Sequence, residues 1–141
     1  MLETVKSFAR IQPAVNQIQS NPHTWNDEVI DYMKNNDIIA EAWGPLSRVT
    51  DEQKARLEKI GENYGKSVAQ VALRYLIQRN IVVIPKTVTK ERMIQNFDVF
   101  NFSLTDEEMA TILGLNQKES LFFSHYDPET VKFLTSLGKR K

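Results

Sequence analysis

A cluster of cations and hydroxyl groups follows an apolar run late in the chain. Lys86 and Thr87 come just after Ile81–Ile84, and Thr89 and Arg92 follow within the next helical turn. A helix that begins after Thr89 would direct its free backbone N–H groups and the positive end of its dipole at this cluster, which favours an anion. The planar guanidinium fork of Arg92 suits a phosphate monoester. The pattern is equally compatible with a helix cap at Thr89 and ordinary surface cations.

Other familiar chemical devices are missing from the sequence. It contains neither G-x-G-x-x-G nor G-x-x-x-x-G-K-[ST], so neither a Rossmann fingerprint nor a P-loop would hold a phosphate. There are no cysteines, and His23 and His125 lie far apart, so we expect no metal site. The acidic pairs at Asp51-Glu52 and Asp106–Glu108 fall in predicted first helical turns, where they complement the helix dipole.

Two further positions could bind a flat polar ligand. Asn16 and Gln17 lie on a predicted strand, where an amide could bind a ligand amide, although neighbouring backbone is the more usual partner. Trp43 ends the next strand, before Gly44-Pro45, and could stack on a ring or simply fill the core.

Strands and helices alternate along the chain. The predicted strands are Ala14–Ile18, Ile38–Trp43 and Ile81–Ile84. Helices are predicted over Leu2–Ala9, over Trp25–Asn35, from Asp51 to Tyr64-Gly65, after Ser67, after Thr89, after Thr105 and from Asp127 to Leu134. Alternation at this spacing predicts βα units and a parallel sheet, with the site at the carboxyl ends of its strands.

Local signals sharpen these boundaries. Thr50 with Gln53 and Thr105 with Glu108 form capping-box patterns, and Gly65 suits a left-handed helix end. Ser67 and Thr89 are the remaining predicted N-caps. Apolar residues at every position of Ile81–Ile84 predict a strand covered on both faces. Phe97, Phe100 and Phe102 alternate and are predicted to lie in the core.

Length and charge limit the possible functions. The 141 residues are enough for a single domain, placed at 1–141 without an internal boundary. Eighteen basic residues balance eighteen acidic ones, so we expect neither nucleic acid nor an anionic membrane as a partner. No apolar run reaches membrane-spanning length and Met1–Gln12 has no signal-peptide pattern, which favours a cytoplasmic location.

Several of these segments resemble the C-terminal part of an aldo-keto reductase. Gly65–Arg79 and the following Ile81–Asn96 carry the resemblance, and Pro13–Ile18 and Glu41–Leu46 fit the preceding strands. The ending, from Glu119 to Glu129, is similar to microbial members near the diketogluconate reductases. The resemblance implies an α/β fold, the C-terminal part of a (β/α)8 TIM barrel. Three parallel strands with flanking helices would form a partial barrel, and NADP(H) would bind at the strand carboxyl ends.

The resemblance assigns one group of residues to the nicotinamide half of the cofactor. Gln17 corresponds to the amide that contacts the nicotinamide carboxamide, and Trp43 to the aromatic residue that stacks on the nicotinamide ring. Leu46 and Arg48 fall in the loop that lies along the pyrophosphate.

A second group corresponds to the adenosine half. Lys86, Thr87 and Arg92 match the family's grip on the adenosine 2′-phosphate, with Thr87 in place of the more usual serine. Gln95 and Asn96 match the pair that meets the adenine.

Departures from the family concern catalysis. Met1 corresponds to a point past the middle of such an enzyme, so the catalytic Asp, Tyr, Lys and His, and the Ser-Asn pair before Pro13, are expected to be missing. Gln19, Asn21 and His23 replace a commoner acid, histidine and aromatic. The chain's own tyrosines fall on helices or in the tail and are not substitutes for the missing one. These tyrosines are Tyr32, Tyr64, Tyr75 and Tyr126.

Two hypotheses follow from this resemblance. The chain is either a C-terminal fragment of an NADP(H)-dependent carbonyl reductase or a non-catalytic, truncated or decayed module that binds nucleotide or acts by association. The expected partners are a nicotinamide dinucleotide and either a second copy of the chain or an N-terminal half-barrel.

Overall fold

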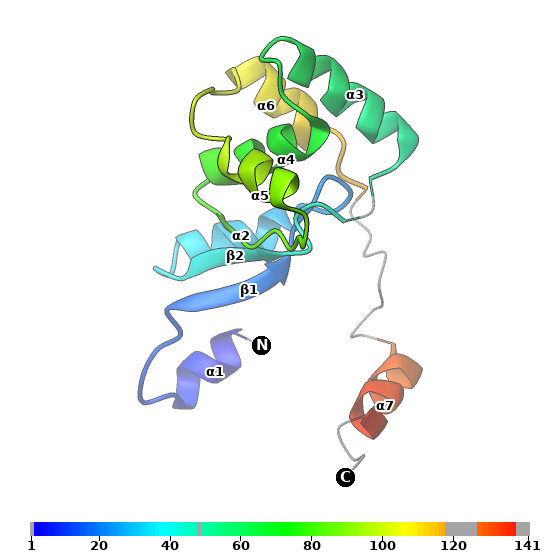
Figure 1. Ribbon diagram of the computed structural model, residues 1–141. Helices are drawn as coiled ribbons and strands as arrows, with labels where there is room; N and C mark the ends of the chain where they lie inside the picture. The colour runs from blue at the N-terminus through cyan, green and yellow to red at the C-terminus, as the bar shows by residue number, and fades with distance from the viewer. Residues whose placement is uncertain (1, 48, 118–126, 138–141) are drawn as a thin grey trace.

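The structure is a computed structural model that describes residues 2–47, 49–117 and 127–137 (Figure 1). Arg48, Ser120–Phe123, His125 and Tyr126 lie outside the described residues. The elements are, in chain order, α1 (Leu2–Phe8), β1 (Val15–Gln19), α2 (Asp27–Lys34), β2 (Ile39–Trp43), α3 (Asp51–Glu62), α4 (Val68–Gln78), β3 (Val82–Val83), α5 (Lys90–Phe97), α6 (Asp106–Leu113) and α7 (Pro128–Leu137).

The three strands form a parallel sheet in the order β1-β2-β3, as the alternation of strands and helices predicted. Val15 lies opposite Ile39, and the pairing continues to Gln19 and Trp43. β3 is shorter than the predicted Ile81–Ile84, because only Val82 and Val83 pair with β2. An edge strand with a single neighbour has hydrogen-bond partners on one side only.

Alternate residues of the strands point to opposite faces of the sheet. On one face, Ala40 and Ala42 are buried against the helices, in a core that includes Leu57 of α3 and Tyr75 of α4. On the other face Ile39 is 51% exposed. Within the described residues, helices therefore cover the sheet on one side.

The same exposure corrects the prediction that Ile81–Ile84 is covered on both faces. Ile81 is buried, but Val82 is 44% exposed and Ile84 45% exposed. An apolar residue at every position allows a strand to be buried on both faces. In the described residues, only one face of this strand is covered.

Three of the four predicted caps form as expected. The Oγ1 of Thr50 accepts from the Gln53 amide at 3.2 Å, and the Thr50 amide donates to the Gln53 side chain at 3.0 Å. Ser67 and Thr105 form the same reciprocal boxes. Gly65 adopts the left-handed conformation expected of a helix end, with φ +62°. Thr89 does precede α5, but its side chain makes no capping hydrogen bond.

The prediction that three phenylalanines lie in the core is wrong for two of them. Phe97 is 80% exposed and Phe100 67% exposed. Phe102 packs against Tyr64, with ring centroids 5.1 Å apart, and Val99 is the residue of this segment that is almost fully buried. The segment turns after α5 rather than running as a strand, so the alternation of side chains does not translate into alternating burial.

The final helix, α7, runs to Leu137 rather than to the predicted Leu134 and has no buried residue. Figure 1 shows it apart from the body of the molecule. Of the helices in the described part of the chain, none combines the length and apolar character needed to cross a membrane. Residues 2–47, 49–117 and 127–137 also contain no group of three potential metal ligands that could hold an ion.

Candidate nucleotide site

A cavity of about 820 Å³ opens between α3, the start of α4, the segment after β3, and α5. Six of the nine predicted cofactor residues line it, namely Leu46, Lys86, Thr87, Arg92, Gln95 and Asn96. Residues from four separate segments therefore meet around one space.

Two features of the fold bring these residues together. Lys86 and Thr87 follow β3 after Ile84 and Pro85, at the carboxyl end of the sheet. Arg92, Gln95 and Asn96 are spaced three and four residues apart on α5, so they share one side of that helix. The predicted clustering of polar side chains after the last strand is thus present.

Thr89 was predicted to belong to this cluster, but it is not among the residues that line the cavity. Its amide donates to the Thr87 Oγ1 at 3.1 Å. This hydrogen bond orients the Thr87 side chain, which lines the cavity. Thr89 therefore stabilises the loop and does not face the cavity.

The cavity carries charges of both signs. Lys66, Lys86 and Arg92 contribute cations, and Glu58 and Glu62 contribute acids. Lys66 is already paired, because its Nζ lies 2.6 Å from the Asp98 carboxylate. Hydrogen bonding from this ammonium group lowers the pKa of Asp98. Over the described residues, neither Lys86 nor Arg92 forms an ion pair, so these two cations are available to an anionic ligand.

One wall of the cavity was not predicted from the sequence. It comes from the end of α3 and the turn into α4, and its residues are Glu58, Gly61, Glu62, Gly65, Lys66, Ser67, Val68 and Ala69. Gly61 is needed for the close approach, because a Cβ there would lie 2.2 Å from the Lys66 carbonyl oxygen. Glu58, Gly61, Glu62 and Gly65 recur at helical spacing, a signal that could have identified this wall.

Gln17 and Trp43, the two residues predicted to contact the nicotinamide, do not line this cavity. Gln17 of β1 donates from Nε2 to the Glu41 Oε1 of β2 at 2.5 Å. Trp43 is half-buried at the carboxyl end of β2 and lies outside the cavity lining. Gly44 follows with φ +61°, and its carbonyl accepts from the Ser47 hydroxyl at 2.6 Å. This turn carries the chain to Leu46, while Arg48 lies outside the described residues.

The three unusual residues lie at the end of β1 and in the buried turn that follows it. The Asn21 Oδ1 accepts from the backbone amides of His23 and Thr24, at 3.0 and 3.1 Å. The His23 carbonyl in turn accepts from the Gln117 amide at 3.0 Å. Gln19, Asn21 and His23 are all buried, and this turn ties the end of β1 to the segment after α6.

None of the tyrosines in the described residues lines the cavity. Burial raises the pKa of Tyr75 to about 12. The hydroxyl of Tyr64 donates to Glu108 at 2.5 Å, and that of Tyr32 donates to Glu3. Donation to a carboxylate raises the pKa of both Tyr32 and Tyr64, because the protonated hydroxyl is the favoured partner.

Known protein sequences resemble most of this chain. The profile of the Aldo/keto reductase family matches residues 1–117. The glyoxal reductase of Bacillus subtilis is 41% identical over 118 residues, which are 84% of this chain and 43% of that protein. The aldo-keto reductase family 1 member A1 of Gallus gallus is 36% identical, covering 82% of this chain and 38% of its own length.

Solved structures give the same result. An aldo-keto reductase from a deep-sea metagenome library of the Medee basin matches with a TM-score of 0.81 and 37% identity, over 89% of this chain and 47% of that one. A Bombyx mori aldo-keto reductase in complex with NADP matches with a TM-score of 0.79 and 31% identity, over 93% and 45% of the two chains. The chain thus spans less than half the length of these relatives, and its three parallel strands with their helices form part of their TIM-barrel fold. On this evidence the chain belongs to the aldo-keto reductase family.

Proposed function

We propose that this chain binds NADP(H) in the cavity between α3, α4 and α5, as the cofactor-holding part of an oxidoreductase that reduces carbonyls to alcohols. The observation that carries the proposal is the meeting of Lys86, Thr87 and Arg92 with Gln95 and Asn96 around one cavity. A structure of a Bombyx mori relative with bound NADP supports the same choice of cofactor.

The chemistry of the cavity fits the adenosine half of this cofactor. Lys86 and Arg92 can both make charge-assisted hydrogen bonds to a 2′-phosphate, and the Thr87 hydroxyl adds a further donor. The amides of Gln95 and Asn96 offer the donors and acceptors that an adenine edge requires. The volume of about 820 Å³ lies within the range typical of small-molecule sites.

Catalysis needs groups that this cavity does not supply. When bound, NADPH supplies the hydride, and a protein acid must protonate the carbonyl oxygen. The tyrosines in the described part of the chain lie outside the cavity, and each has a raised pKa. This supports the proposal that the chain lacks the family's catalytic tetrad and that Gln17 and Trp43 contribute only part of a nicotinamide wall.

Calorimetric titration tests the binding proposal directly. We expect NADP+ to bind more tightly than NAD+, and Arg92→Ala to remove on the order of 1.5–3 kcal/mol of that preference, the scale of a hydrogen bond to a charged group. Arg56→Ala is the matched control, because Arg56 lies on α3 with its partner Glu52 and does not line the cavity. Equal affinities of the unaltered chain for the two nucleotides would contradict the proposal.

A non-catalytic module is the second candidate function. The predicted residues of the adenosine half meet around the cavity, whereas Gln17 and Trp43 do not line it, which favours a part in nucleotide binding. NADPH oxidation with a panel of carbonyl compounds separates the two candidates. We expect no turnover by the pure chain, and turnover with a separately supplied N-terminal half-barrel only if the chain serves an enzyme. We place either function in the cytoplasm, with which the lack of cysteine is compatible.

A further inference from the structure

The helix that carries much of the proposed site, α5, contributes no buried residue to the hydrophobic core. None of the residues of α5 is buried, yet Arg92, Gln95 and Asn96 of this helix line the cavity. Hydrophobic packing of its own side chains therefore does not position α5. The contacts that do position it begin at the residue that ends the helix.

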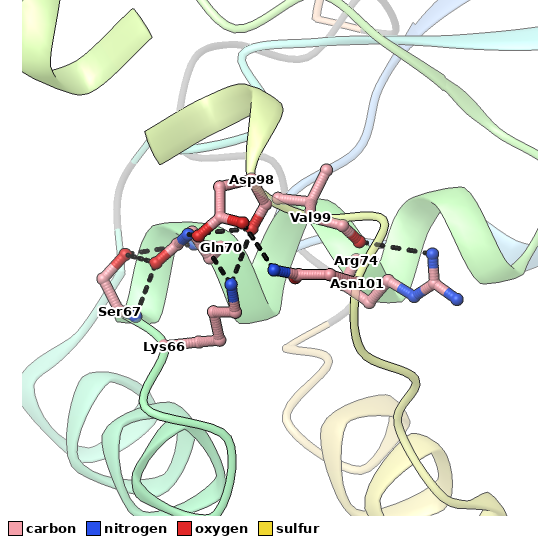
Figure 2. A network of polar contacts seen from close by, with 7 residues as sticks. All are labelled: Lys66, Ser67, Gln70, Arg74, Asp98, Val99 and Asn101. Carbon is pink, nitrogen blue, oxygen red and sulfur yellow. Dashed lines mark hydrogen bonds and ion pairs between the residues drawn. The ribbon is translucent and has the colours of Figure 1, made fainter. Parts of the chain in front are cut away.

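Asp98, the C-cap of α5, is bound to residues around the start of α4 (Figure 2). The Lys66 Nζ lies 2.6 Å from the Asp98 Oδ2 and 3.2 Å from its backbone carbonyl. The Gln70 Nε2 reaches the same two oxygens, at 3.2 and 2.9 Å. The Asn101 Nδ2 lies 2.7 Å from the other carboxylate oxygen. Both the side chain and the main chain of the C-cap are thus held.

The partners of Asp98 are themselves held in place. The Lys66 amide donates to the Gly61 carbonyl at 2.9 Å, at the close approach that requires glycine. The Gln70 side chain is buried and accepts from the Ser67 amide at 3.0 Å. One residue beyond Asp98, the Val99 side chain is almost fully buried. The network therefore joins α5 to a fixed part of the scaffold.

We infer that Asp98, held by Lys66 and Gln70, is a positioning residue that sets α5, and with it Arg92, against the 2′-phosphate end of the nucleotide site. Asp98 does not itself line the cavity, so it acts through the helix. This inference rests on the proposed NADP(H) site for its functional meaning. That Asp98 holds α5 in place follows from the hydrogen bonds of Asp98 and does not depend on the ligand.

The test is Asp98→Asn in the full chain, with binding of NADP+ and NAD+ measured by calorimetry. We expect the affinity for NADP+ to fall roughly 5- to 20-fold, a usual scale for energetic coupling between sites. The affinity for NAD+ should fall by less, because it loses the proposed adenine contacts of Gln95 and Asn96 on the same helix but has no 2′-phosphate contact with Arg92 to lose. A merely structural role would weaken both equally, and this outcome would overturn the inference. Tighter binding of NADP+ would also overturn it, since Asp98 would then act only by occupying Lys66.

A second measurement needs no nucleotide. Amide hydrogen exchange should accelerate in α5 of the Asp98→Asn variant by roughly tenfold or more, with exchange in α3 and α6 unchanged. Lys66→Arg, which keeps the positive charge, should leave α5 exchange close to that of the unaltered chain. Lys132→Met is the matched control, because Lys132 is paired with Glu129 at the same 2.6 Å on α7. Exchange in α5 that is the same in the Asp98→Asn variant and the unaltered chain would refute the inference, even if the chain binds NADP+. If exchange in α5 is faster in the variant but the unaltered chain binds no dinucleotide, the proposed function is refuted and the role of Asp98 in holding α5 is retained.

Discussion

The two faces of the sheet differ in how completely they are covered. On the helix side, Ala40 and Ala42 are buried and the core continues into α3 and α4. On the opposite side, Ile39, Val82 and Ile84 are each about half exposed, beside the Gln17–Glu41 hydrogen bond. The strands have apolar side chains on both faces, yet only one face is packed. Apolar composition therefore shows which residues can be buried, while the presence of a second layer decides which of them are.

The contrast is most directly tested with two isoleucines of one segment. Ile81 is buried and Ile84 is 45% exposed. We expect Ile81→Ala to lower the free energy of unfolding by about 2–5 kcal/mol, the usual cost of removing a buried isoleucine side chain, and Ile84→Ala to lower it by less than about 1 kcal/mol. Urea denaturation followed by circular dichroism measures both. Similar losses at the two positions would mean that the open face is covered in solution.

The next prediction is that a second copy of the chain covers the exposed face of the sheet. An exposed apolar face with two free sheet edges favours self-association. We expect sedimentation velocity to show oligomers, and Val82→Lys to weaken association at least tenfold, equivalent to about 1.4 kcal/mol. Val131→Lys on α7 is the control, since Val131 is similarly exposed but lies off the sheet. A monodisperse, cooperatively unfolding monomer would rule out this use of the face.

Helix capping extends the comparison from the packed body to α5. Thr50 accepts a hydrogen bond from Gln53 and caps α3, whereas Thr89 makes no side-chain cap for α5. Thr50→Ala should therefore reduce the free energy of unfolding by about 1 kcal/mol, and Thr89→Ala by only a few tenths. Thermal unfolding of the two variants gives the comparison, and a larger loss at Thr89 would show that its hydroxyl caps α5 in solution.

The smallest expected effect lies at the junction of α3 and α6. Burial would raise the pKa of Glu108, but hydrogen bonds from Tyr64, Thr105 and Asn63 outweigh it and hold this pKa below its ordinary value of 4.5. A carboxylate with a lowered pKa stabilises the fold above pH 4.5, and this stabilisation is lost as the pH falls through the folded-state value.

Tyr64→Phe should therefore reduce the free energy of unfolding at pH 7 by less than about 1 kcal/mol. The difference from the unaltered chain should shrink below pH 4.5 as Glu108 becomes protonated. Urea denaturation at a series of pH values measures this, and a difference that grows toward acid would show that the Tyr64 hydroxyl does not favour the ionised carboxylate.

Much of the chain could be predicted because its signals are local. The boxes at Thr50, Ser67 and Thr105 involve residues three positions apart, so their geometry depends little on distant parts of the fold. The order and direction of the strands follow from βα alternation, which leaves few alternatives for a parallel sheet. The placement of Lys86 and Thr87 after the last strand follows from the same reasoning.

Other features depend on contacts between distant segments. Nothing near Phe97 and Phe100 indicates that no layer covers them, and the apolar run at Ile81–Ile84 does not show that pairing stops at Val83. The α3 wall of the cavity depends on Gly61, which lets the turn into α4 pass close to α3, and the position of α5 depends on the contact between Asp98 and Lys66. Capping and hydrophobic period are properties of neighbouring residues and can be predicted from their order. Burial and the spacing of charges around a cavity are properties of the packed chain, and only the tertiary structure decides them.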